Sequence, residues 1–129
     1  MMAAPTATPN KRRRRVLAID DEPAMTEWLK MVIEAEGYEV RTALIGTRGE
    51  EIFKQWRADV VVTDLMLPDL DGIQLLRRLK EIDPWPEIVV ISGQGTVARA
   101  LEARQARAFY FLEKSVGQDG LIVMVGKSI

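Results

Sequence analysis

The chain of 129 residues contains neither cysteine nor histidine. This absence excludes disulfides, zinc sites built from these residues, cysteine nucleophiles and histidine general bases. Aromatic residues are few, at 6% of the sequence. No apolar run approaches the roughly 18 residues that a membrane-spanning helix needs, so we expect no integral membrane protein. Any chemistry must therefore use carboxylates, hydroxyls, lysine, the backbone or a bound ion.

The composition is that of one ordinary globular domain. Apolar residues make up 47% of the chain and charged residues 29%, which excludes collagen-like and wholly disordered proteins. A chain of this length buries roughly two thirds of its unfolded surface, which is enough for a hydrophobic core.

Basic side chains are concentrated at the start of the chain. Residues 1–15 hold the five-residue run Lys11–Arg15 and no acidic residue. The chain has 18 basic and 19 acidic residues in all, so residues 16–129 hold 13 basic and 19 acidic ones. This acidic excess argues against a broad nucleic-acid-binding face, and we expect no direct DNA binding by the domain and no membrane association.

The composition also predicts a boundary near the start. Residues 1–10 contain no aromatic or branched aliphatic side chain, so they cannot offset the entropy of ordering. We expect residues 1–14 to form a disordered basic leader and residues 15–129 to form the folded domain. The basic run could contact nucleic acid or an acidic partner, although a solvated tail is the simpler interpretation.

Apolar segments of strand length recur along the chain. Three of them lack the alternation of polar and apolar residues and are rich in β-branched side chains, which is typical of parallel strands covered on both faces. These segments are Val16–Asp20, Val60–Asp64 and Ile88–Ser92. Tyr38–Thr42 and Ala108–Leu112 are weaker candidates for two more strands.

Helical patterns occupy the intervals between these segments. One apolar stripe of helical spacing comprises Met25, Trp28, Leu29, Val32 and Ile33. Further helices are expected around Ile73–Leu79 and over Thr96–Ala106. Arg48–Trp56 and Asp119–Lys127 fit a helix poorly because both contain glycine. The alternation predicts an α/β fold with a doubly wound, five-stranded parallel sheet.

Polar residues end the predicted strands. Asp20 ends the first predicted strand in chain order and Asp21 follows it. Asp64 ends the third strand, Ser92 ends the fourth, and Lys114 follows the fifth. Ligands bind doubly wound sheets at the carboxyl ends of the strands, so these groups converge. Clustered carboxylates repel unless a cation neutralises them, and oxygen ligands favour Mg²⁺.

This set of groups suits phosphoryl transfer. An aspartate can attack a phosphoryl group, while a metal ion and a lysine stabilise the charge of the transferred group. Acidic residues at strand ends are often only helix N-caps, but a hydroxyl and a lysine on successive strands favour a functional site.

The same residues stand in motifs that resemble the receiver domains of two-component response regulators. The motifs are V-L-A-I-D-D-E-P at Val16–Pro23, V-V-V-T-D-L-M-L-P-D-L-D-G at Val60–Gly72, V-V-I-S-G at Val89–Gly93 and F-L-E-K at Phe111–Lys114. The resemblance covers Arg15 to Ile129. It implies a flavodoxin-like (βα)5 fold with strand order 2-1-3-4-5, and a cytoplasmic protein.

The resemblance implies a role for each matching residue. Asp64 would be the phosphoacceptor. Asp21 and Asp64 would bind Mg²⁺ directly, Asp20 through water, and Met66 through its main-chain carbonyl. Three further roles fall to residues after the acceptor: Ser92 as the switch hydroxyl, Phe111 as the switch aromatic and Lys114 as the phosphoryl contact.

The implied partners follow from the same resemblance. The phosphoryl donor would be a histidine kinase or a phosphotransfer protein, and the switching face would comprise helix 4, strand 5 and helix 5. That face would form a homodimer, or meet a C-terminal output domain or a separate target. The segment Gly93–Thr96, together with the motif Phe111–Lys114, is similar to the corresponding segments in receivers attached to enhancer-binding transcription activators.

Two residues depart from the family pattern. Ser115 stands where proline usually follows the lysine, so we expect a trans Lys114–Ser115 peptide bond. Arg107 stands where glycine is common. Two other functions remain open: a small Mg²⁺-dependent phosphatase that forms an aspartyl phosphate, and an interaction module that is never phosphorylated.

Overall fold

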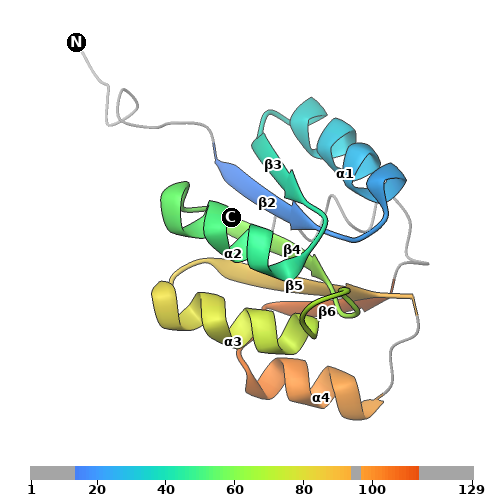
Figure 1. Ribbon diagram of the computed structural model, residues 1–129, viewed down its shortest axis with the longest axis vertical. Helices are drawn as coiled ribbons and strands as arrows, with labels where there is room; N and C mark the ends of the chain where they lie inside the picture. Colours follow the sequence, from blue (N-terminus) through green and yellow to red (C-terminus); the bar gives the residue numbers. More distant parts are fainter. Residues whose placement is uncertain (1–13, 94–96, 114–129) are drawn as a thin grey trace.

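The computed structural model describes residues 14–93 and 97–113, which form a parallel sheet with helices on both faces (Figure 1). The strands are β2 (Arg15–Ile19), β3 (Glu39–Ala43), β4 (Val60–Asp64), β5 (Glu87–Ser92) and β6 (Tyr110–Glu113). Their order is β3-β2-β4-β5-β6, which is 2-1-3-4-5 along the chain. This confirms the predicted α/β class and strand order.

The helices are α1 (Pro23–Ala35), α2 (Gly46–Gln55), α3 (Gly72–Ile82) and α4 (Val97–Gln105). Helix α1 covers one face of the sheet, whereas α2, α3 and α4 cover the other (Figure 1). Residues 1–13 of the predicted basic leader, the segment predicted as a last helix and the Lys114–Ser115 bond lie outside the described residues. No helix of the described part is long and apolar enough to cross a membrane.

Alternate residues of β2 serve the two faces of the sheet. Val16 and Ala18 pack with α1, while Leu17 and Ile19 pack with the α2 and α3 side. All four side chains are fully buried. Burial on both faces explains why the central strands read as continuous apolar runs.

Helix α2 forms despite the glycine that made its sequence a poor helix. A Cβ on Gly49 would lie 2.4 Å from Cδ1 of Ile19, so the glycine lets α2 approach β2 closely. Buried Ile52 and Phe53 then anchor the helix on the sheet. Tertiary packing, rather than intrinsic propensity, therefore stabilises α2.

Helix α4 ends in a Schellman motif with an arginine at the position that usually holds glycine. The N–H of Arg107 donates to the carbonyl of Arg104 at 3.0 Å, and the N–H of Ala108 donates to the carbonyl of Ala103 at 2.9 Å. Arg107 has a φ of 74°, a left-handed conformation in which a side chain is strained. Gly37, which follows α1, takes a φ of 95° without this cost.

We therefore expect Arg107→Gly to raise the free energy of unfolding by about 1 kcal/mol, because glycine removes the strain. Urea unfolding measures the change. Arg77→Gly is the matched control, because Arg77 is an exposed residue within α3 and its replacement should destabilise by about 1 kcal/mol. Equal destabilisation by the two substitutions would contradict the assignment of strain to Arg107.

Candidate functional site

Three carboxylates meet at the carboxyl ends of two neighbouring strands. Asp20 and Asp21 follow β2, and Asp64 ends β4, which pairs with β2 in parallel. Each side chain offers a carboxylate oxygen, and these oxygens lie within 4.8 Å of one another. Asp20 and Asp64 are buried, whereas Asp21 is exposed and gives the cluster access to solvent.

Backbone contacts fix the orientation of this cluster. The carboxylate of Asp20 accepts a hydrogen bond from the N–H of Glu22 at 2.9 Å. The carboxylate of Asp64 accepts one from the N–H of Met66 at 3.3 Å. The Asp20 N–H donates to the carbonyl of Ala43 at 3.1 Å, which ties the turn to β3.

The donor set fits a magnesium ion. Mg²⁺ binds oxygen at 2.0–2.1 Å, so ligands on opposite sides of its octahedron lie about 4 Å apart. The spacing within 4.8 Å suits direct ligation by some of these oxygens and ligation through water by others. Three carboxylates in one partly buried cluster also repel, and a divalent cation would remove that repulsion.

A tight loop connects β4, which ends at Asp64, to α3. Met66 and Asp71 form an antiparallel bridge, and the N–H of Gly72 donates to the carbonyl of Leu65 at 2.7 Å. Asp71 caps α3 by accepting from the N–H of Ile73 at 2.7 Å, within a capping box completed by Gln74. The loop therefore holds Asp64 from its C-terminal side.

Gly72 is required by close packing in this loop. A Cβ at this position would lie 2.4 Å from the carbonyl oxygen of Asp64 and 2.9 Å from Cα of Leu65. Both atoms belong to the backbone and cannot move aside cheaply.

Asp69 binds the loop to α2, a contact that sequence reasoning missed. Its carboxylate accepts hydrogen bonds from the N–H groups of Gly46 at 2.8 Å and Thr47 at 2.9 Å. Burial by itself raises the pKa of Asp69, but these hydrogen bonds outweigh it and place the pKa below its ordinary value. The signal in the sequence was Gly46-Thr47 at a helix start, where N–H groups need acceptors.

Arg99 of α4 also binds this loop, a contact that the sequence analysis did not predict. Its guanidinium pairs with the carboxylate of Asp71 and with Glu102 of α4, the latter at 2.8 Å. Helix α4 is thereby linked to the cap of α3 and to the loop that follows Asp64.

The remaining predicted residues lie on the next strands. Ser92 ends β5, which pairs with β4 through Asp64 and Ile91, and its side chain is only 2% exposed. Phe111 lies on β6 and is half-buried. Met66 begins the loop and its side chain is exposed. Lys114 lies outside the described residues.

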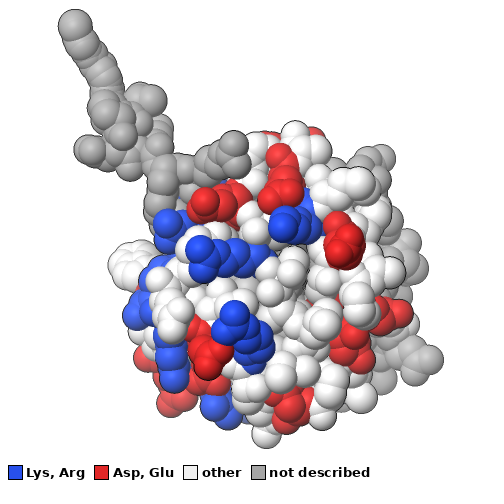
Figure 2. Space-filling model, turned by 45° about the horizontal axis from the view of Figure 1, so that its top comes forward, with Lys and Arg blue, Asp and Glu red and all other residues white. Residues whose placement is uncertain are grey.

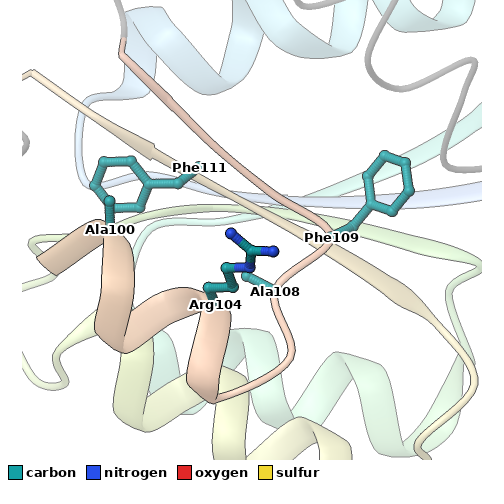
Figure 3. A pocket seen from close by; sticks show the side chains of 5 residues that line it. All are labelled: Ala100, Arg104, Ala108, Phe109 and Phe111. Carbon is teal, nitrogen blue, oxygen red and sulfur yellow. The ribbon is translucent and has the colours of Figure 1, made fainter. Parts of the chain in front are cut away.

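Phe111 lines a hollow between α4 and β6 (Figure 3). The hollow has a volume of about 420 Å³ and is also lined by Ala100, Arg104, Ala108 and Phe109. The ring of Phe111 lies over Ala100 at one end, and Phe109 lies at the other. The switch aromatic predicted from the motif therefore has space beside it.

Known proteins are similar to this chain in sequence and in structure. Residues 16–126 match the response regulator receiver domain family. The chemotaxis protein CheY of Thermotoga maritima is 36% identical over 115 residues, which cover 88% of this chain and 96% of that protein. The beryllofluoride-activated NtrC4 receiver domain dimer superposes with a TM-score of 0.84 at 33% identity, over 88% of this chain and 94% of that one.

A longer regulator is also similar. The transcriptional regulatory protein GlrR of Escherichia coli is 31% identical over 106 residues, which cover 82% of this chain and 24% of that protein. The chain thus spans about a quarter of the length of that relative. The chain belongs to the response regulator receiver domain family of two-component systems.

Proposed function

We propose that this receiver accepts a phosphoryl group on Asp64 from a histidine kinase or a phosphotransfer protein, in a reaction that depends on Mg²⁺. The convergence of Asp20, Asp21 and Asp64 at the carboxyl ends of β2 and β4 carries this proposal. Buried Ser92 at the end of the adjacent strand β5 supports it.

The residues divide the chemistry between them. A carboxylate oxygen of Asp64 attacks the phosphorus of a phosphohistidine and forms a P–O bond. The P–N bond breaks, its electron pair goes to the ring nitrogen, and the leaving imidazole takes a proton from water. The hydroxyl of Ser92 donates a hydrogen bond to a phosphoryl oxygen, and Lys114 pairs with another. Asp21, Asp64 and the carbonyl of Met66 would hold Mg²⁺ directly, and Asp20 through water. The bound metal supplies positive charge against the transferred group.

Intact mass spectrometry after incubation with acetyl phosphate and Mg²⁺ tests the proposal. We expect one phosphoryl adduct per chain, stable to acid and labile to base, and none when EDTA is present. Steady hydrolysis of an added phosphomonoester would instead favour a phosphatase. The absence of any adduct with every donor would favour an interaction module.

A metal-binding prediction follows from the cluster. We expect Asp21→Asn to weaken Mg²⁺ binding at least tenfold and to slow phosphorylation, because an anionic ligand is lost while the shape is kept. Isothermal titration calorimetry measures the affinity. Glu22→Gln is the matched control, since Glu22 is an exposed neighbour outside the cluster and should bind Mg²⁺ like the wild type. Equal affinity of Asp21→Asn and wild type would contradict the metal assignment.

The output step is part of the same proposal. When Ser92 binds the phosphoryl group, its loop moves inward and Phe111 turns toward the core, so that the face of α4 and β6 changes shape. The hollow beside Phe111 supports this, because it leaves room for the ring to move. The changed face forms a homodimer, or meets a C-terminal output domain or a separate target. The beryllofluoride-activated receiver domain of NtrC4, which is similar in structure, is a dimer.

Analytical ultracentrifugation with and without a beryllofluoride mimic tests the switch. We expect self-association to increase at least fivefold with the mimic, and Asp64→Asn to remove the increase. Equal self-association in both states would exclude a dimer that forms on activation.

Two further statements belong to the proposal. One is the cytoplasmic location that the resemblance to the family implies, and the other is control of transcription by an attached output domain.

A further inference from the structure

Helix α2 begins without a cap of its own, at the edge of the sheet that carries the carboxylate cluster. Its N-cap residue, Ile45, makes no side-chain hydrogen bond, although the first N–H groups of a helix need acceptors. One oxygen of the Asp69 carboxylate accepts from the N–H of Gly46 at 2.8 Å, and the other accepts from the N–H of Thr47 at 2.9 Å. Asp69, from the loop that follows β4, thereby caps α2.

The start of α2 also packs directly on this loop. A Cβ on Gly46 would lie 3.0 Å from Cδ1 and 3.1 Å from Cβ of Leu70, which in turn packs against the core. One turn further along, α2 approaches β2 closely through Gly49 and Ile19. The carboxylate of Asp69 therefore joins the loop to a helix that is itself fixed on the strand leading into the carboxylate cluster.

Asp69 lies within the loop whose ends support the site. Met66 and Asp71 form the bridge that closes the loop, and the N–H of Met66 donates to the carboxylate of Asp64 at 3.3 Å. The main-chain carbonyl of Met66 is also one of the proposed Mg²⁺ ligands. Asp69 is not a member of the three-carboxylate cluster found among the described residues. Any effect of Asp69 on a metal ion would therefore act through the loop.

The charge of the molecule alone would attract a cation to this side. Acidic side chains, with few basic ones among them, lie on the right of Figure 2, the side toward which the strands run in Figure 1. Tight binding also depends on ligand geometry, because Mg²⁺ requires a nearly ideal octahedron of oxygens at about 2.0–2.1 Å. Residues that orient the ligands without touching the metal typically contribute about 10- to 100-fold to its affinity.

We propose that Asp69 is a positioning residue of the phosphorylation site, which holds residues 65–71 against α2 so that Asp64 and Met66 keep the orientation that binds Mg²⁺. This role rests on the proposed function, since it concerns the same metal site. Burial raises the pKa of Asp69, but the hydrogen bonds from Gly46 and Thr47 place it below its ordinary value. The carboxylate is therefore ionised at neutral pH and accepts both bonds.

Two measurements on the full chain test this role: calorimetric titration with MgCl₂, and the initial rate of adduct formation from acetyl phosphate at a series of Mg²⁺ concentrations. We expect Asp69→Ala to weaken Mg²⁺ binding about tenfold and to raise the Mg²⁺ concentration for half-maximal rate by the same factor. The rate at saturating Mg²⁺ should stay within about twofold of the wild type, because Asp69 lies outside the carboxylate cluster. A merely structural role would lower that maximal rate instead.

Two further variants calibrate the effect. Asp69→Asn should weaken Mg²⁺ binding less, by about threefold, because its single amide oxygen replaces only one of the two carboxylate oxygens that accept the N–H groups. Asp83→Ala is the matched control, since Asp83 also accepts a loop N–H, that of Trp85 at 3.1 Å, but follows the opposite end of α3. We expect it to bind Mg²⁺ like the wild type. Circular dichroism checks that each variant is folded.

The outcomes separate this role from the proposed function. Wild-type Mg²⁺ affinity in Asp69→Ala would overturn the role alone, and so would equal weakening in Asp83→Ala, which would indicate a general loss of stability. If the proposed function itself is wrong, the wild type will bind no Mg²⁺ and form no adduct, and this role is then refuted with it.

Discussion

Asp64→Asn is expected to abolish the phosphoryl adduct while leaving the fold intact. Asp64 ends the fully buried strand β4, and its own side chain is 5% exposed. The amide of asparagine has nearly the same shape, and its oxygen can still accept the hydrogen bond from the N–H of Met66. An amide is not a nucleophile toward phosphorus, so the reaction is lost. Intact mass after acetyl phosphate treatment measures the adduct.

Asp59→Asn is the matched control for this experiment. Asp59 immediately precedes β4 and so lies at the other end of that strand from Asp64. Its carboxylate accepts a hydrogen bond from the N–H of Arg15, which an asparagine oxygen can also accept. We expect Asp59→Asn to be phosphorylated like the wild type. Labelling of Asp64→Asn to the wild-type level would show that another side chain is the acceptor.

Gly72→Ala is expected to lower the free energy of unfolding by about 2–4 kcal/mol and to impair phosphorylation of whatever protein folds. The added methyl would lie 2.4 Å from the carbonyl oxygen of Asp64, which is part of the backbone that positions the acceptor. Relief of this clash requires α3 or the end of β4 to shift. Urea unfolding and the initial rate of adduct formation measure the two effects.

Gly93→Ala is the matched control, because a Cβ on Gly93 meets nothing within 4 Å. Gly93 also follows a strand at the same edge of the sheet, so the comparison isolates the close contact. We expect Gly93→Ala to change the free energy of unfolding by less than about 0.5 kcal/mol. Wild-type stability of Gly72→Ala would mean that the loop after Asp64 can move freely.

The sequence predicts the sheet and its carboxylate cluster for a clear physical reason. Strands buried on both faces leave continuous apolar runs, and the residue after each run falls at the same edge. The positions of Asp20, Asp21 and Asp64 therefore follow from strand ends alone, without knowledge of any side-chain conformation. Their convergence in the structure agrees with that prediction.

The contacts that support the cluster could not be predicted in the same way. Asp69 accepts hydrogen bonds from the backbone N–H groups of Gly46 and Thr47, which precede it by 23 and 22 positions. Arg99 pairs with Asp71, which precedes it by 28 positions. Such pairs depend on how helices pack, which no local pattern records. Gly49 likewise reads as a helix breaker until its contact with Ile19 explains it.

Arg107 illustrates a different limit. The sequence shows an arginine where the family commonly has glycine, but only the backbone shows that the left-handed conformation is kept. The roles of Lys114 and Ser115 stay predictions, since both residues lie outside the described part of the chain.

Mapping the phosphorylated residue tests the assignment of Asp64 as the phosphoacceptor most directly. The protein is treated with acetyl phosphate and Mg²⁺, the acyl phosphate is reduced with borohydride, and peptides are sequenced by mass spectrometry. We predict that reduction converts Asp64 alone to homoserine, and only in samples that contained Mg²⁺. Reduction at Asp20 or Asp21, or at no aspartate despite a measured adduct, would contradict the assignment of Asp64 as the phosphoacceptor.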